Sequence, residues 1–288
     1  MLKAHRRRVE RGLTTEDMSI MSHMVFIGSS GTGKTMMARL VARMLHHIGL
    51  LSKGHVLEVA SKDLIAGHCG QTGPKTFAAC EKAFGGVLFI DEAYSINPKG
   101  DSAFGRECVD TLVKVMEDHR EKFVVIMAGY PECMEEFMET NPGLKSRFNA
   151  RFMFYFDDYT TEELAEIFVL ELSKRHYHLD EGLEDRLPQL ITQYTTQDAR
   201  ARQNGRLMRT LVENCIANQN RRWVHLDDNE VSDTDMVTVK EEDFVATGYA
   251  PKDPLDPWAV VKIGRLPEDP GTDASPKPEE TPSWAHLL

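Results

Sequence analysis

Gly28-Ser29-Ser30-Gly31-Thr32-Gly33-Lys34-Thr35 is the stretch from which the fold of this chain can be worked out. Two glycines with four residues between them, followed by lysine and threonine, form the phosphate-binding loop pattern. The glycines permit a tight turn whose backbone N–H groups converge on an anion, and the next helix adds the positive end of its dipole. In such a loop Lys34 faces the β- and γ-phosphates and the Thr35 hydroxyl binds Mg²⁺. All eight residues are therefore predicted to bind a nucleotide.

The sequence on each side of the loop has the pattern that the motif requires. Before it lies the apolar run Met24-Val25-Phe26-Ile27, which has the length of a buried strand. After it, apolar residues recur at helical spacing at Met37, Leu40, Val41, Met44, Leu45 and Ile48. The order strand, loop, helix is the context in which this pattern binds phosphate.

The composition is that of an ordinary globular protein of 288 residues, a length that allows about two domains. The net charge of −11 disfavours nucleic acid as the main partner, because nucleic-acid binding depends on cationic contacts to phosphates. The five cysteines have no paired spacing, which favours a reducing compartment, the cytoplasm or the stroma or matrix of an organelle. No stretch has the length of a membrane span and the N-terminus lacks the apolar core of a secretory signal, so we expect neither membrane insertion nor secretion.

Residues 23–158 are predicted to form an α/β nucleotide-binding domain with a parallel sheet. Besides the strand before the loop, four apolar runs have the length of strands, at His55–Ala60, Val87–Asp91, Phe123–Ala128 and Phe152–Phe156. Helical patterns lie between these runs, and strands that alternate with helices imply crossover connections and a sheet covered on both faces.

Three further segments complete the predicted organisation. Residues 1–22 form a basic N-terminal segment or linker with an arginine cluster. Residues 159–250 read as a small helical lid domain, whose first helix begins at Thr160 or Thr161 with Glu163 in a capping-box arrangement. Residues 251–288 are rich in proline and acidic residues, which predicts a disordered tail.

Asp91 and Glu92 form the second chemical signal, because they end the apolar run that starts at Val87. An ATP-hydrolysing site needs one acid beside the loop hydroxyl to hold Mg²⁺ and one base to orient the attacking water. Asp91, together with Thr35, is predicted to bind Mg²⁺, and Glu92 is predicted to be the base. Adjacent residues of a strand point to opposite faces, so both acids can act only if the strand ends there and the backbone turns.

The loop, the Asp-Glu strand end and the helical domain that follows resemble the AAA+ ATPases. Within that superfamily the chain is similar to the CbbX and stage V sporulation protein K family, which includes the type VII secretion ATPase EccA. The similarity runs from residue 23 to about 223. The matching stretches are Gly73-Pro74-Lys75-Thr76, Gly85–Tyr94, Val124–Tyr130 and Asn141–Phe148.

This resemblance implies a ring, usually of six subunits, in which each ATP lies between neighbours. Arg147, in Ser146-Arg147-Phe148, matches the arginine finger, which reaches the site of the next subunit and stabilises charge on the transferred phosphoryl group. Arg206 matches the sensor arginine of the lid, which contacts the γ-phosphate in its own subunit. The residues alone leave two plainer alternatives open: Arg147 as a helix-capping surface residue, and Arg206 with Arg209 as a solvated face.

One departure from the family concerns the loop after the second strand. Relatives carry an aromatic and an aliphatic residue there that line the central pore, whereas this chain has His68 and Cys69. The overall prediction is a Mg²⁺-dependent ATPase that remodels a protein partner and works in a homo- or hetero-hexameric ring. Because this loop differs from that of the relatives, one alternative remains: the chain is a subunit that binds ATP in a mixed ring and threads little or no substrate. A DNA-directed ATPase is a second alternative, which the acidic charge disfavours.

Overall fold

The computed structural model describes Arg11 and residues 23–97, 102–148, 150–223 and 232–245. The predictions for the basic segment, apart from Arg11, and for the tail at 251–288 concern residues outside this set. In the described part of the chain, no helix is both long enough and apolar enough to cross a membrane.

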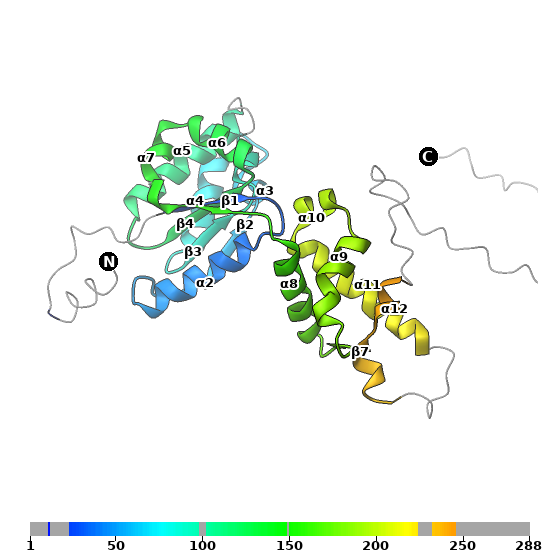
Figure 1. Cartoon of the computed structure of the whole chain (residues 1–288). Helices are drawn as coiled ribbons and strands as arrows, with labels where there is room; N and C mark the ends of the chain where they lie inside the picture. Colours follow the sequence, from blue (N-terminus) through cyan, green and yellow to red (C-terminus); the bar gives the residue numbers. More distant parts are fainter. Residues whose placement is uncertain (1–10, 12–22, 98–101, 149, 224–231, 246–288) are drawn as a thin grey trace, which may run out of the picture. The chain divides into compact units, whose positions relative to one another are not determined.

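Five parallel strands form one sheet in the order β2-β3-β4-β1-β5 (Figure 1). The strands are β1 (Met24–Gly28), β2 (Val56–Val59), β3 (Val87–Ile90), β4 (Val124–Gly129) and β5 (Met153–Phe156). Every residue of β1, β3 and β4 is buried, as expected for strands covered on both faces. The predicted parallel-sheet α/β fold is therefore confirmed, and each predicted strand lies within a residue or two of the observed one.

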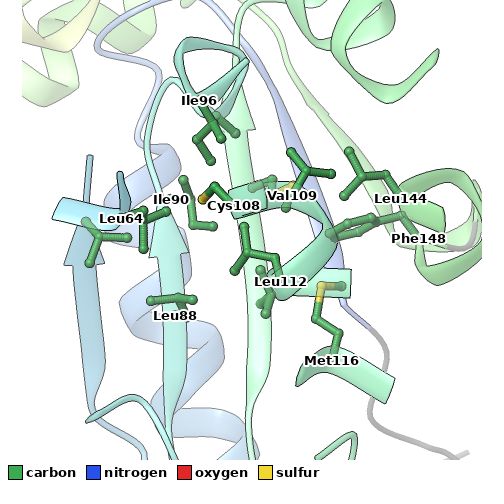
Figure 2. Packing of buried hydrophobic residues seen from close by; sticks show 14 of the residues in the cluster. Leu64, Leu88, Ile90, Ile96, Cys108, Val109, Leu112, Met116, Leu144 and Phe148 are labelled. Carbon is green, nitrogen blue, oxygen red and sulfur yellow. The ribbon is translucent and has the colours of Figure 1, made fainter. Parts of the chain in front are cut away.

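Alternation along the strands divides the interior into two cores. Val25 and Ile27 of β1 belong to the larger core, which includes residues of α4, α5, α6 and α7. Figure 2 shows part of this core, with Leu112 of α5 and Leu144 of α7. Met24 and Phe26 belong to the other core, which includes residues of α2. These helices are α2 (Lys34–His47), α4 (Thr72–Lys82), α5 (Ala103–Asp118), α6 (Pro131–Glu139) and α7 (Pro142–Arg147). Shorter segments of this part are α3 (Ser61–Leu64) and two 3₁₀ turns, at Ala93–Ile96 and Ala150–Phe152.

Helix α2 forms where the spacing of apolar residues predicts it, but not all of those apolar residues are buried. The buried residues are Ala38, Ala42 and Leu45, whereas the side chains of Leu40 and Met44 are 50 % and 48 % exposed. The small alanines let the helix backbone approach the sheet closely, so the long apolar side chains lie on its flank.

The helical domain has a core of its own, which includes Leu164, Phe168 and Leu211. Its first helix starts with the predicted capping box, because the Thr160 hydroxyl accepts from the Glu163 N–H and the Glu163 carboxylate accepts from the Thr160 N–H. The helices are α8 (Thr161–Ser173), α9 (Leu187–Tyr194), α10 (Gln197–Gln203), α11 (Gly205–Trp223) and α12 (Glu241–Val245). The sequence predicts a short strand or helix over residues 239–245, where the structure has the end of β7 (Thr238–Val239) and α12. Helix α10 and strand β6 (His178–Leu179), which pairs with β7 in parallel, have no counterpart in the sequence-based assignment.

His23, which precedes β1, is a buried histidine held in its neutral form. Its Nδ1 accepts a hydrogen bond of 3.0 Å from the Val125 N–H, so this nitrogen carries no proton. The pKa of His23 is lowered to about 4, mainly by burial and to a smaller extent by the charge of Arg147, while a hydrogen bond with the Met116 backbone acts in the opposite direction. The unfolded chain therefore binds a proton at His23 at a pH where the folded chain does not.

This difference predicts a loss of stability on acidification. The contribution of His23 is complete above the unfolded pKa of 6.5 and is lost as the pH falls from there towards 4. Between pH 7 and pH 5 it should remove about 2 kcal/mol from the free energy of unfolding, measured by urea denaturation. In His23→Asn the amide oxygen can accept from Val125 without titrating, so the variant should lose less stability over the same interval. Equal losses in the two proteins would contradict this account of His23.

Candidate functional site

The loop between β1 and α2 has a backbone that only glycine adopts easily at two positions. Gly31 and Gly33 have φ angles of 77° and 88°, in the left-handed region where a side chain is strained. The Thr32 hydroxyl donates to the Ser29 carbonyl at 2.9 Å and closes the turn within the loop. The buried strand β1 fixes one end of the loop and α2 fixes the other, so the loop lies at the carboxyl edge of the sheet.

The ammonium group of Lys34 lies against the loop itself. Its Nζ donates to the carbonyls of Gly28 and Ser29 at 2.8 and 2.7 Å. Burial lowers the pKa of Lys34, the carboxylates of Asp91 and Glu92 oppose this effect, and the charge of Arg206 adds to it. Lys34, Asp91, Glu92 and Arg206 line the same cavity.

The strand that carries the two acids ends at Ile90, one residue before Asp91. Glu92 has φ 48° and ψ 49°, a left-handed conformation that is uncommon outside glycine, and its N–H donates to Asp91 Oδ1 at 3.1 Å. The backbone turn that both carboxylates require is therefore present, and both side chains are exposed. Strained backbone of this kind is concentrated at functional sites.

A cavity of about 780 Å³ is lined by eight of the predicted site residues. They are Ser30, Gly31, Gly33, Lys34 and Thr35 of the loop, Asp91 and Glu92 after β3, and Arg206 of the lid, whereas Gly28, Ser29 and Thr32 of the loop do not line it. Apolar side chains line it as well, contributed by Met36 and Leu40 of α2 and by Ile167 and Leu170 of α8. The volume and the mixture of a phosphate-binding loop, cations and apolar walls fit a nucleoside triphosphate. The oxygen donors of Thr35 and Asp91 are the ligand type that Mg²⁺ prefers.

Arg147 does not line this cavity. It is the last residue of α7, where its Nε lies 3.0 Å from the Glu117 carboxylate of α5 and its Nη1 donates to the Ser146 hydroxyl at 3.1 Å. The Nε–H is not aimed at the carboxylate oxygen, so the contact with Glu117 is an ion pair rather than a hydrogen bond. The fold brings the loop, the two acids and Arg206 together around one cavity, whereas Arg147 lies outside it.

The pore-loop candidates lie in an exposed connection. Residues 67–71, which include His68 and Cys69, are exposed and link α3 to α4. This segment follows β2, as the sequence predicts, and none of its residues belongs to either core of the α/β domain.

Sequence reasoning missed two residues that join the lid to the loop. The Tyr159 hydroxyl donates to the Thr32 carbonyl at 3.1 Å, and the Asn204 side-chain amide donates to the Ser30 carbonyl at 3.3 Å. Asn204 precedes a glycine, and an Asn-Gly pair is a turn signal that could have marked this boundary between helices. Tyr159 stands at the predicted boundary of the helical domain, but no pattern in the sequence indicates that its hydroxyl contacts the loop.

Gly31 provides the first test of the site. A Cβ atom at this position would lie 2.0 Å from the Gln203 carbonyl oxygen, so Gly31→Ala must displace either the loop or the lid. We expect the affinity for ATP, measured by calorimetric titration, to fall roughly tenfold or more.

Gly49→Ala is the matched control for this substitution. Gly49 has φ 80°, close to the 77° of Gly31, but a Cβ there meets nothing within 4 Å. It should cost about 1 kcal/mol of stability through backbone strain and leave ATP binding unchanged. If Gly31→Ala binds ATP as well as Gly49→Ala does, the close approach of lid and loop is not needed for binding.

Comparison with known proteins agrees with this geometry. Residues 24–156 match the family model described as "ATPase family associated with various cellular activities (AAA)", and residues 160–252 match the model described as "AAA lid domain". The first match spans the sheet with its loop, and the second spans α8 to α12.

Relatives over most of the chain carry several different names. The chain is 38 % identical over 241 residues to stage V sporulation protein K of Bacillus subtilis (strain 168), covering 83 % of this chain and 73 % of that protein. It is 36 % identical to the chloroplastic ribulose bisphosphate carboxylase/oxygenase activase of Cyanidioschyzon merolae (strain NIES-3377 / 10D), covering 85 % of this chain and 82 % of that protein. The crystal structure of the FIGL-1 AAA domain in complex with ADP superposes with a TM-score of 0.56 at 18 % identity, covering 88 % of this chain and 78 % of that one, and supports the fold.

Proposed function

The chain belongs to the AAA family of ATPases, with the lid domain of that family, and from this premise we propose that it is a Mg²⁺-dependent ATPase that remodels a protein partner. Membership of this family means that the chain binds and hydrolyses ATP. The observation that carries the proposal is the meeting of Lys34, the two acids at the end of β3 and Arg206 around a single cavity.

Each residue has a role that its position supports. Lys34 releases the carbonyls of Gly28 and Ser29 and donates to the β- and γ-phosphates, while the loop N–H groups bind the same oxygens. When bound, Mg²⁺ neutralises charge that develops on the phosphates, and Thr35 and Asp91 are the residues that would hold it. Glu92 accepts a hydrogen bond from the attacking water and orients it towards the γ-phosphate.

The position of Arg147 favours a site shared between subunits. Because Arg147 is absent from the wall of its own cavity, it cannot stabilise the phosphoryl group there without a rearrangement of α7. In a ring, the same residue can serve the cavity of the next subunit. We therefore propose a ring, homo- or hetero-hexameric, with one composite site between each pair of neighbours.

A protein partner is proposed from the named relatives. One is an activase of a carboxylase and another is a sporulation protein, so relatives that share most of this chain carry names from unrelated processes. A common ATPase that acts on different proteins accounts for this range. The partner of this chain is a protein whose identity neither the cavity nor the names specify.

A second candidate function follows from the exposed residues His68 and Cys69. A chain with this loop could bind ATP within a mixed ring while another subunit grips the substrate. If the ring hydrolyses ATP but moves a protein substrate only after His68→Tyr and Cys69→Ile are introduced together, this second function replaces the first.

Glu92→Gln tests the catalytic base. The amide keeps the size of the side chain but cannot accept a proton, so ATP should still bind while the steady-state hydrolysis rate falls roughly a hundredfold or more. Glu121→Gln, at an exposed glutamate outside the cavity wall, is the control and should hydrolyse ATP at the rate of the unmodified chain. Hydrolysis by Glu92→Gln at the control rate would remove Glu92 from the mechanism.

Mixed rings test whether Arg147 acts on a neighbour. Lys34→Ala should lose its own site and Arg147→Ala should lose the site it completes, so each variant alone should be inactive. In a mixture, an intact loop in one subunit can meet an intact Arg147 in the next, and part of the ATPase activity should return. The double variant Lys34→Ala/Arg147→Ala mixed with Arg147→Ala is the control without rescue. No recovery in the first mixture would argue against a shared site.

A further inference from the structure

Asn204 is a fully buried polar residue between two helices of the lid. Its relative exposure is 0 %, and it separates α10 from α11. Its φ of 47° and ψ of −128° lie in a region that glycine adopts far more readily than other residues. A buried amide in a strained backbone is costly unless every polar atom has a partner.

The side chain of Asn204 has a partner for each of its groups. Its Oδ1 accepts from the Tyr159 N–H at 2.9 Å. Its Nδ2 donates to Asp158 Oδ1 and to the Ala201 carbonyl, both at 2.9 Å, and more weakly to the Ser30 carbonyl at 3.3 Å. One amide thereby joins the phosphate loop, the linker before α8 and the end of α10.

Neighbouring contacts extend this network along the loop. The Gly205 N–H donates to the Gly31 carbonyl at 3.2 Å, and the Tyr159 hydroxyl donates to the Thr32 carbonyl. Three successive carbonyls of the loop therefore accept hydrogen bonds from the lid side: Ser30 from Asn204, Gly31 from Gly205, and Thr32 from Tyr159. A movement of the loop that accompanies phosphate binding would be transmitted directly to the residues that start α11.

Arg206 is the second residue of α11 and lines the cavity. The Asn204 carbonyl accepts from the Leu207 N–H at 3.0 Å, which fixes the first turn of the helix on which Arg206 lies. A guanidinium at the end of a long side chain contacts a phosphate accurately only if its backbone is held in place. The Asn204 side chain ties the residue before this turn to Tyr159, Asp158 and Ser30, so it helps to hold the backbone from which Arg206 projects.

We propose that Asn204 is a positioning residue for Arg206, joining the phosphate loop, the linker and the lid so that Arg206 is aimed at the phosphates of a bound nucleotide. The inference rests on the proposed function, because it requires Arg206 to contact those phosphates. It extends that function by naming the residue that couples the loop to the lid. Asn204 itself does not line the cavity.

Asn204→Gly removes the amide while allowing the same backbone conformation. We expect kcat for ATP hydrolysis to fall roughly ten- to a hundredfold, because a small misplacement of Arg206 weakens its contact in the transition state. The kcat of Arg206→Ala should fall by a similar or larger factor. The double variant should hydrolyse ATP no more slowly than Arg206→Ala alone, because Asn204 acts through Arg206.

The outcomes separate this inference from the proposed function. If Arg206→Ala hydrolyses ATP at the unmodified rate, the role of Arg206 fails and the positioning role of Asn204 fails with it. If kcat falls in Arg206→Ala and falls further when Asn204→Gly is added in the double variant, Arg206 keeps its role and only the positioning role of Asn204 is overturned. An unchanged kcat in Asn204→Gly also overturns it.

A second variant covers the case in which Asn204→Gly does not fold, which circular dichroism would reveal. Asp158→Ala removes one acceptor of the Asn204 amide at an exposed position, so the lid should remain folded. We expect a two- to fivefold loss of kcat, on the order of a single weakened hydrogen bond, and no further loss when it is combined with Arg206→Ala. A normal kcat, or a loss that adds to that of Arg206→Ala, would overturn the inference.

Discussion

The contact between Gly31 of the phosphate loop and the residues between α10 and α11 is the constraint on which the site depends. The Gly205 N–H donates to the Gly31 carbonyl, and Gly31 has no side chain to keep the Gln203 carbonyl away. This approach holds the start of α11 beside the loop, and Arg206 lines the same cavity as Lys34 and the two acids. A motif that could bind any anion thereby becomes part of a site that also contains two carboxylates and a second cation.

The sheet and the lid contribute to this site in different ways. Strands β1 and β3 are buried along their whole length, so the loop and Asp91 have little freedom to move relative to each other. The lid has its own core and is held to the loop by hydrogen bonds from Tyr159, Asn204 and Gly205. Hydrogen bonds of this kind exchange more easily than a packed core, which suits a lid that responds to the nucleotide.

The sequence predicted the fold and the charged residues that line the cavity, Lys34, Asp91, Glu92 and Arg206 among them, because these depend on local patterns, whereas the apolar wall from α2 and α8 was not predicted. Strand lengths, the spacing of the loop glycines and the Asp-Glu strand end can be read without knowing what lies nearby in space. The buried face of α2 was harder to predict, since two alanines and Leu45 are buried while Met37, Leu40 and Met44 stay exposed. The partners of Asn204 were not predictable, because Ser30 and Tyr159 are far from it in the sequence and backbone atoms carry no pattern.

The central claim is that the loop and the start of α11 form one nucleotide site. Hydrogen–deuterium exchange of the Glu92→Gln variant, with and without ATP and Mg²⁺, measures this directly. The claim predicts that the backbone amides of residues 29–35 and those of 204–209 gain protection together and over the same range of ATP concentration. Protection of the loop with no change at residues 204–209 would contradict it.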